Sequence, residues 1–473
     1  MKKYKILVYL MILVSMILCM PSIMYLINNK TVDQFDGYYT YSLIRTDNLI
    51  IRIMSGLLVI GVLLLFGYIY INICKHEKQI FNSRKQILMF ILLISIIFMF
   101  ILPFVSSDIY YYIGDSWLAA KYGKNPYYTS VGDLQNSGIN DEILNNTGYW
   151  KNTTSVYGPI WNMTATLLVK MSFGKVTIAL FIFKFAAYLV HILNSHLMYK
   201  ITKSNKWMLI YGLNPLVLLE LLSNVHNDIY LILFILLTIY TLTKKNNIWL
   251  ASIFISISIA IKYSTILICP FILLYYFRNE NNIPQKILKC IGIGLIIISI
   301  VVLLYMPYFK DVTIFKNMLV QSNRYSQSIW AYLATIETRS ALVSVLNDIK
   351  LYLFALSYVM ILIKCIFKTK INFSYLMRKY NWVMLVFIFL VLTNFQKWYV
   401  LWLMPTLIWE RKNIRNFILN LTIFGMAPSL IYFIIENDTW VYGVYYSIIL
   451  VILSAFNVIV PKIIENKKII RSK

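Results

Sequence analysis

Residues 106–161 read SSDIYYYIGDSWLAAKYGKNPYYTSVGDLQNSGINDEILNNTGYWKNTTSVYGPIW, and apolar runs of membrane-span character lie on both sides of them. This stretch holds four aspartates, one glutamate, eight tyrosines and three tryptophans, with one Asn-Pro and one Gly-Pro turn pair. Loops that a rigid scaffold holds in place commonly carry function. We therefore expect residues 106–160 to form a large outer loop between two spans, and we expect the chemistry of the protein to lie there.

The composition identifies the class of protein before any motif does. The chain has 473 residues, of which 60% are hydrophobic and only 13% are charged, and its mean hydropathy is +0.69. Soluble domains carry about 25% charged residues, and repeated apolar runs of about 20 residues need a bilayer around them. We predict an all-α, polytopic membrane protein that forms one integral membrane domain over residues 1–473.

The positive charge follows the membrane topology. A net charge of +25 would indicate nucleic acid in a soluble protein, but no basic, aromatic-laced soluble domain is present, so we expect no nucleic-acid partner. More than half of the 44 Lys and Arg lie in one set of connections, which holds only four of the 19 acidic residues. The positive-inside rule makes that face cytoplasmic. Both termini are then cytoplasmic, and the long loop lies outside.

The apolar runs predict roughly 11 to 14 crossings. They lie near 5–27, 49–73, 87–105, 175–199, 207–223, 229–243, 248–261, 264–277, 287–306, 340–363, 380–393, 399–409, 414–435 and 439–460. Residues 159–173 are expected only to dip into the membrane. Several runs are too short to cross about 30 Å of hydrocarbon as straight helices at about 1.5 Å per residue. Broken helices of that kind are tolerated where they line a cavity.

Two aspartates lie near the start of the loop. Asp108 follows the third span directly, and Ser106 and Ser107 can cap a short helix there. Asp115 is seven residues, or two turns, further along, so both carboxylates lie on one face of that helix. Gly123 is a suitable residue to end it. A carboxylate at a helix start can also serve only to complement the helix dipole, and this alternative stays open for both aspartates.

A second polar cluster lies in residues 213–230, LNPLVLLELLSNVHNDIY. Four polar residues gather at a helix end that should meet the outer interface: Asn224, His226, Asn227 and Asp228. Glu220 lies deeper, in apolar sequence, and ionisable groups at membrane depth are functional hypotheses by default. The alternative is a polar turn with a hydrogen-bonded glutamate. One His with one or two carboxylates falls short of a clear ligand set, so no metal ligand is assigned and a divalent cation stays an open option.

Two lysines follow on the outer side. Lys262, in AIKYST, interrupts an apolar stretch and suggests the tip of a helical hairpin. Lys397 stands beside Trp398 in QKWYVLWLMP, which also contains Trp402. Both lysines suit phosphate binding, with snorkelling as the alternative for Lys262, and we expect Trp402 to belong to the aromatic belt at the interface. Two further candidate cations lie in the outer loop 307–339: Arg324 and Arg339.

One carboxylate, several cations and aromatic rings at an outer membrane face suit glycosyl transfer from a lipid-phosphate sugar. No nucleotide sugar is available outside the cell, so the activated donor must be a lipid. The acceptor hydroxyl needs a general base within about 3 Å, and cations stabilise the leaving phosphate. A single catalytic carboxylate argues against an ordinary glycoside hydrolase, which uses two.

The same residues carry a family resemblance. SSDIYYYIGDSWLAAKYGKNPYY followed by SVYGPIW resembles the first-loop signature of bacterial polyprenol-phosphate-mannose-dependent alpha-mannosyltransferases, within the membrane-embedded C-type glycosyltransferase superfamily. LNPLVLLELLSNVHNDIY, AIKYST with the following CPF, and QKWYVLWLMP are similar to later blocks of that family. The resemblance spans residues 90–410. Many superfamily members carry paired acidic residues in this loop, whereas here Ser107 precedes Asp108.

The resemblance implies an inverting transfer of a hexose, most simply mannose, from a polyprenyl-phosphate donor to an extracytoplasmic glycan or glycolipid acceptor. The catalytic aspartate of the superfamily falls on Asp108, which would act as the base. We assign the donor phosphate to three residues: His226, Lys262 and Lys397. We assign contacts with the substrates to six more: Tyr111, Asp115, Tyr157, Asn227, Asp228 and Trp398.

Two other functions remain open at this point. A transporter or flippase of lipid-linked saccharides would also use charges inside the membrane. Transporter folds often show internal repeats with matching broken helices, and we find no such repeat in the sequence. A polymerase that joins lipid-linked glycans is the other alternative, and its chemistry is closer to that of a transferase.

Overall fold

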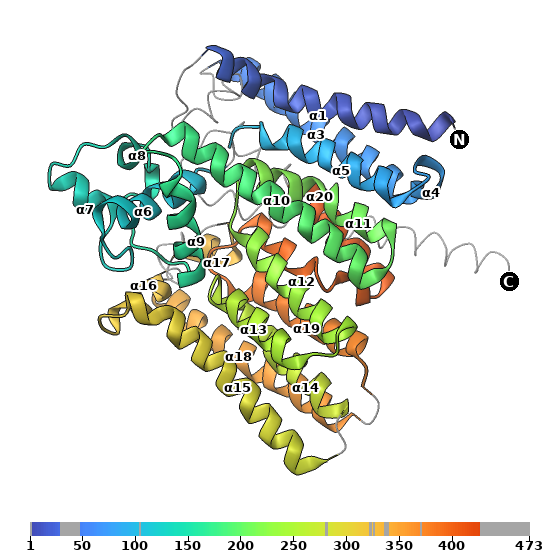
Figure 1. The fold of residues 1–473 in the computed structure, drawn as a ribbon, viewed down its shortest axis with the longest axis vertical. Coiled ribbons are helices and arrows are strands. Elements are labelled where there is room, and N and C mark those ends of the chain that lie inside the picture. Colours follow the sequence, from blue (N-terminus) through green and yellow to red (C-terminus); the bar gives the residue numbers. More distant parts are fainter. Residues whose placement is uncertain are drawn as a thin grey trace.

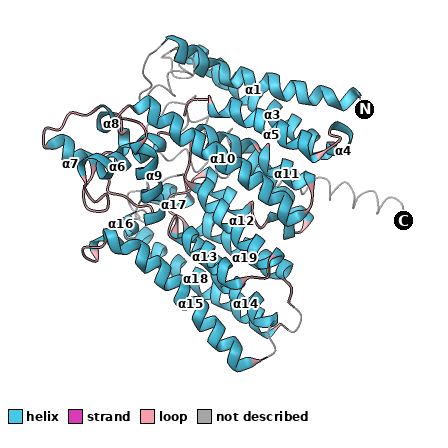
Figure 2. Ribbon diagram, in the orientation of Figure 1, coloured by secondary structure: helices cyan, strands magenta, loops and turns pink. Residues whose placement is uncertain are grey.

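The computed structural model describes residues 2–28, 48–103, 106–279, 282–320, 324, 327–334, 340–368 and 371–425. Within these ranges the chain forms α-helices, short 3-10 and π-helices, and no β-strand (Figure 2). The predicted all-α class is therefore confirmed.

The first half of the chain carries the outer loop between its apolar helices. Its elements are α1 (Lys2–Asn28), α3 (Leu49–Lys75), α4 (Glu77–Ile80), α5 (Arg84–Met99), α6 (Asp108–Tyr122), α7 (Val131–Asn136), α8 (Glu142–Asn145), η2 (Gly148–Trp150), α9 (Pro159–Lys170), α10 (Val176–Thr202), α11 (Asn205–Gly212) and η3 (Val217–Ser223).

The second half alternates long helices with short broken ones. Its elements are α12 (Asp228–Lys244), α13 (Ile248–Ile259), η4 (Tyr263–Ile268), α14 (Cys269–Asn279), α15 (Ile283–Tyr305), η5 (Met306–Tyr308), α16 (Thr313–Val320), α17 (Ile329–Ala334), α18 (Ser340–Phe367), α19 (Phe373–Val386), η8 (Phe387–Val391), η9 (Lys397–Leu403), η10 (Leu407–Trp409) and α20 (Lys412–Phe424).

Long apolar helices confirm a multi-pass membrane protein. In the described part of the chain, six are long and apolar enough to cross a bilayer: Tyr4–Asn28, Ile53–Lys75, Val176–Thr202, Ile283–Tyr308, Asp348–Phe367 and Phe373–Val391. The pair η3 and α12 passes the same test together but bends by 114° between Ser223 and Asp228. This bend is a broken helix of the kind that the short runs predicted. The remaining predicted crossings correspond to shorter helices or lie, wholly or partly, beyond residue 425.

The helices pack in successive layers (Figure 1). α1 packs on α3 and α5, α10 joins α5 to α12, and α12 packs on α13, which contacts α15. The outer-loop helices α6, α7 and α8 lie together at one side of this stack. The bend between η3 and α12 meets η9 and lies close to the start of α6, so segments far apart in the sequence come together there.

Local chemistry explains where α6 begins and ends. The Ser106 hydroxyl accepts a hydrogen bond from the backbone N–H of Asp108 at 3.3 Å, as expected of a capping residue, whereas the Ser107 side chain makes no cap. Gly123 ends the helix in the left-handed region with φ +62°, where glycine meets no steric penalty. Asp108 is therefore the first residue of α6.

A close backbone contact joins the loop to the hairpin that carries Lys262. The backbone N–H groups of Gly158 and Ile160 donate to the carbonyls of Ile261 and Ala260, both at 3.1 Å. A Cβ on Gly158 would lie 2.1 Å from the Ala260 carbonyl oxygen, so only glycine permits this approach. The start of α9 is thereby fixed against the tip of the α13–η4 hairpin, where the sequence placed Lys262.

The outer loop has a small core of its own, formed by Leu118, Val131, Leu134 and Leu144. The Asp141 carboxylate connects α6 to the start of α8 beside this core. It accepts hydrogen bonds from Trp117 Nε1 (3.0 Å), Lys121 Nζ (2.6 Å), Tyr122 Oη (3.0 Å) and the backbone N–H of Ile143 (2.9 Å). Burial would raise the pKa of Asp141, but the hydrogen bonds from Lys121 and Trp117 outweigh it and lower that pKa below its ordinary value.

The substitution Asp141→Asn should loosen this loop. It keeps the shape of the side chain but removes the charge from several hydrogen bonds, at a cost of about 1.5–3 kcal/mol. Hydrogen exchange of the α7 and α8 amides should therefore speed up relative to an Asp311→Asn control. Because the lowered pKa stabilises the folded state above the ordinary value of 3.8, the wild-type loop should lose the same protection as the pH falls below that value. Equal protection in both variants would contradict this role of Asp141.

Candidate active site

Asp108 is partly exposed, whereas the neighbouring carboxylates Glu220 and Asp228 are fully buried. Its Oδ1 accepts a hydrogen bond from Trp150 Nε1 at 3.2 Å, and its Oδ2 lies 3.6 Å from His226 Nδ1. The Asp108 side chain keeps 19% of its surface exposed, whereas the His226 side chain is fully buried. Asp108 is thus held from two sides with part of its carboxylate open.

His226 sits at the bend between η3 and α12. Its ring stacks on the Trp398 ring, with centroids 3.6 Å apart and planes 19° from parallel. Its Nε2 lies 3.1 Å from Glu220 Oε2, so the two ring nitrogens face two different carboxylates. The preceding Val225 has φ +57°, a conformation that is costly for a β-branched residue and persists only where surrounding structure enforces it. The backbone is therefore fixed to present His226 to Asp108.

Glu220 is a fully buried carboxylate inside the π-helix η3. Its Oε1 lies 3.1 Å from Lys397 Nζ, and its Oε2 accepts a hydrogen bond from Asn224 Nδ2 at 2.9 Å. An unpaired charge at this depth would be very costly. Lys397, Glu220, His226 and Asp108 consequently form one chain of polar contacts that runs from the protein interior to the partly exposed Asp108 carboxylate.

A second buried pair lies beside this chain. Asp228 Oδ1 contacts Lys262 Nζ at 2.8 Å and also accepts a short hydrogen bond from Trp402 Nε1. The Lys262 ammonium group lies over the rings of Tyr399 and Trp402, 5.2 and 5.3 Å from their centroids. We expected Trp402 to lie in the aromatic belt at the membrane interface, but this expectation is wrong because its side chain is only 4% exposed. Trp402 instead donates a hydrogen bond to Asp228 inside the protein.

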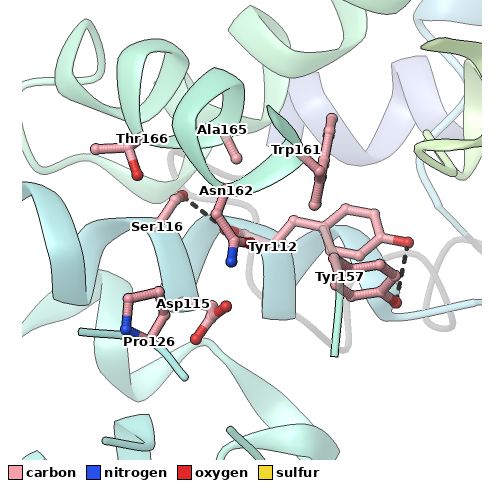
Figure 3. Close-up of a pocket in the computed structure, with 9 residues that line it drawn as sticks. All are labelled: Tyr112, Asp115, Ser116, Pro126, Tyr157, Trp161, Asn162, Ala165 and Thr166. Atoms are coloured by element: carbon pink, nitrogen blue, oxygen red, sulfur yellow. Dashed lines mark hydrogen bonds between the residues drawn. The ribbon is translucent and has the colours of Figure 1, made fainter. Parts of the chain in front are cut away.

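Three further residues that were expected to contact substrate are a buried asparagine, Asn227, and two tyrosines beside α6, Tyr111 and Tyr157. Asn227 is fully buried, and within the described chain neither polar atom of its side chain has a hydrogen-bond partner. Tyr111 donates to the carbonyl of Thr153 at 3.4 Å. Tyr157 donates to the Tyr112 hydroxyl at 3.4 Å, and their rings meet edge to face (Figure 3). These tyrosines form an aromatic wall along α6.

Asp115 does not join the Asp108 cluster. It is buried in a separate small pocket between α6 and α9 (Figure 3). Burial raises the pKa of Asp115 to about 8, although a hydrogen bond with Ser155 acts in the opposite direction. The carboxyl group is therefore largely protonated at neutral pH, in contrast with a carboxylate that complements a helix dipole.

Arg324 is a cation without a carboxylate partner among the described residues. Its guanidinium lies over the Trp150 ring, 4.4 Å from the centroid, and donates to Thr153 Oγ1 at 3.2 Å. Trp150 in turn donates to Asp108, so the guanidinium and the open carboxylate share one neighbour. Arg339, the other candidate in this loop, lies outside the described residues.

Sequence reasoning missed several of these contacts. Trp150 and Thr153 lie in the quoted loop, but nothing in their spacing distinguishes them from its other aromatic and hydroxyl residues. Tyr399 follows Trp398 directly and was not assigned, although an aromatic run beside a candidate phosphate-binding lysine was a usable signal. No group of three or more His, Cys, Asp or Glu side chains suited to hold a metal ion occurs in the described part of the chain.

Residues 13–278 match the family model described as "Alpha-(1->6)-mannopyranosyltransferase, N-terminal domain". This match covers more than half of the 473 residues. The chain belongs to this mannosyltransferase family. No curated protein and no solved structure matches it.

The family match confirms the resemblance to membrane alpha-mannosyltransferases of the C-type superfamily, and with the apolar helices it identifies a multi-pass membrane mannosyltransferase. The matched residues include Asp108, Glu220, His226 and Lys262. Lys397 and Trp398 lie beyond the match, in the part of the chain that closes the site from the C-terminal side.

The buried pair of Glu220 and Lys397 yields a stability test for this mannosyltransferase. Glu220→Gln leaves Lys397 with an uncompensated buried charge, which should cost about 3–5 kcal/mol. Adding Lys397→Met removes that charge, so the double variant should unfold at a higher temperature than the single one. Thermal unfolding of the purified protein in detergent measures both. If the double variant were destabilised by the sum of the two single changes, the pair would not be coupled.

Proposed function

We propose that this mannosyltransferase takes mannose from a polyprenyl-phosphate donor and transfers it, with inversion, to an extracytoplasmic glycan or glycolipid. The family supports mannosyl transfer with an alpha product, and inversion then requires a beta-linked donor. The proposal rests on Asp108, the partly exposed carboxylate at the end of a buried chain of polar contacts through His226 and Glu220 to Lys397. The apolar helices around it provide the surroundings that a prenyl chain requires.

In the proposed reaction Asp108 acts as the general base. The acceptor oxygen attacks C1 of mannose, the bond between C1 and the phosphate oxygen breaks, and the acceptor proton passes to an Asp108 oxygen. When the His226 ring proton is on Nε2, facing Glu220, the Nδ1 lone pair faces Asp108. A protonated Asp108 can then donate a hydrogen bond to Nδ1. We therefore assign buried His226 to the support of Asp108 rather than to the donor phosphate.

We propose that the leaving phosphate binds to the more accessible cations, Lys262 and Arg324. Lys262 keeps 16% of its side-chain surface exposed, compared with 7% for Lys397, and an ammonium group in contact with one carboxylate still has hydrogen-bond donors to offer. Arg324 contacts no carboxylate in the described chain, and it lies one tryptophan away from Asp108. Its guanidinium fork suits two phosphate oxygens at once.

Labelled donor tests the proposed function directly. Polyprenyl phosphate carrying radiolabelled mannose would be supplied to proteoliposomes with wild type, Asp108→Asn or the exposed control Asp311→Asn. We expect wild type and the control to pass label to an acceptor, and Asp108→Asn to be slower by a factor of about 10² to 10⁴, because a general base is lost. Equal rates in all three would remove Asp108 from the mechanism. Label that crosses the bilayer without changing its chemical form would instead indicate a flippase.

Arg324 gives a second test. Arg324→Ala should raise the KM for the lipid donor about tenfold or more, as expected for the loss of a charged hydrogen bond. Arg324→Lys should bring the donor KM part of the way back, since it restores the positive charge but cannot donate to two phosphate oxygens from a planar guanidinium group. Lys310→Ala, which removes a cation over Tyr128 in the same outer loop, is the matched control. An unchanged donor KM in Arg324→Ala would exclude the assignment to phosphate.

A further inference from the structure

Lys184 is a fully buried lysine to which the proposed reaction gives no role. It lies in α10, a helix that is long and apolar enough to cross a bilayer. Among the described residues no carboxylate contacts it, and its Nζ donates only to backbone carbonyl oxygens. An ionisable side chain in a membrane-spanning helix is costly and is a functional hypothesis by default.

The three carbonyls that Lys184 contacts belong to two different helix ends. Its Nζ donates to Ser223 O at 2.6 Å and to Leu222 O at 3.4 Å, and these are the last two residues of the π-helix η3. It also donates to Ile101 O at 2.7 Å, two residues beyond the end of α5. The three N–H donors of an ammonium group match these three oxygens.

The bend after η3 explains why a lysine is needed there. The last carbonyls of a helix have no intrahelical N–H partner, and they carry the negative end of the helix dipole. Here the chain turns by 114° between η3 and α12, and lipid around such a break offers no hydrogen-bond donor. Leaving these carbonyls unpaired would be costly. Lys184 supplies both hydrogen bonds and a positive charge at the point where the bend begins.

The end of η3 is also close to the proposed base and its support. His226 follows Ser223 by three residues, and its Nδ1 lies 3.6 Å from Asp108 Oδ2. Ser223 makes a second link to α5, because its hydroxyl donates to the carbonyl of Phe98 at 3.2 Å. The hydrogen bonds of Lys184 go to the backbone and not to His226 or Asp108. Lys184 therefore acts on this pair through the backbone that carries His226.

We propose that Lys184 is a positioning residue: by holding the end of η3 against the end of α5, it fixes the bend that presents His226 to Asp108. This inference rests on the proposed function for the role of Asp108. The effect of Lys184 on the orientation of His226 does not depend on the donor or the acceptor.

Histidine NMR tests this orientation without any substrate. The chain has four histidines, so the ring-nitrogen signals of isotope-labelled full-length protein in nanodiscs can be assigned by single replacements. Lys184→Met keeps an unbranched side chain of similar length but donates no hydrogen bond, so we expect the His226 signals to shift or broaden. His191→Leu is the matched control. His191 is also buried in α10 and contacts the carbonyl of Gly212, so its loss should leave the His226 signals unchanged.

Transfer kinetics with the labelled donor test the consequence for the reaction. Lys184→Met should lower kcat by a factor of about 10 to 100, the loss expected when reacting groups move by about 1 Å, with both KM values nearly unchanged. Lys184→Gln, whose amide can still donate to a carbonyl, should retain part of the rate. His191→Leu should lower the unfolding temperature but keep kcat. In a His226→Asn background, Lys184→Met should add little, because both changes act on the same contact.

Three outcomes would refute this role of Lys184. They are unshifted His226 signals in Lys184→Met, losses of kcat that multiply in the double variant, and a lower unfolding temperature with unchanged kcat. If Lys184→Met does not fold, Lys184→Gln decides the same comparisons. A wild type that transfers no mannose from the lipid donor would refute the proposed function, while the histidine signals would still show whether Lys184 orients His226.

Discussion

The pairing of buried charges at a break in a membrane helix determines the rest of this site. Glu220 lies in the interior, where a lone carboxylate would be very costly, and contacts with Lys397, Asn224 and His226 balance it. Those partners come from the next turn of the bend and from η9, so satisfying one carboxylate fixes the relative positions of two distant segments. Asp108 then receives a rigid neighbour on its inner side while its outer side stays open.

The same constraint explains the irregular backbone. η3 is a π-helix, the chain turns by 114° before α12, and Val225 adopts a left-handed conformation. Irregular backbone at membrane depth is tolerated only where protein or a cavity surrounds it, and here α5, α10 and η9 pack against η3. The strained residue Val225 lies where Glu220, His226 and Asp108 converge, and strained residues commonly cluster at functional sites. A straight helix would have directed His226 away from Asp108.

Part of this architecture could be predicted from the sequence, for physical reasons. Apolar length predicts spans, and an acid such as Glu220 inside an apolar run or Asp108 at its end is conspicuous because burying charge is costly. The partners could not be predicted: Lys262 with Asp228, or Trp402 buried against the same carboxylate, depend on how three separate segments pack.

We propose Asp108 as the base because it lies on the exposed side of this polar cluster. The sharpest test is a structure of the Asp108→Asn protein with a bound polyprenyl-phosphate mannose. If Asp108 is the base, the residue 108 side chain should lie within about 3–4 Å of the space next to C1, on the face of the sugar opposite the phosphate. A donor whose C1 lies on the other side of the aromatic wall, beyond reach of residue 108, would contradict it.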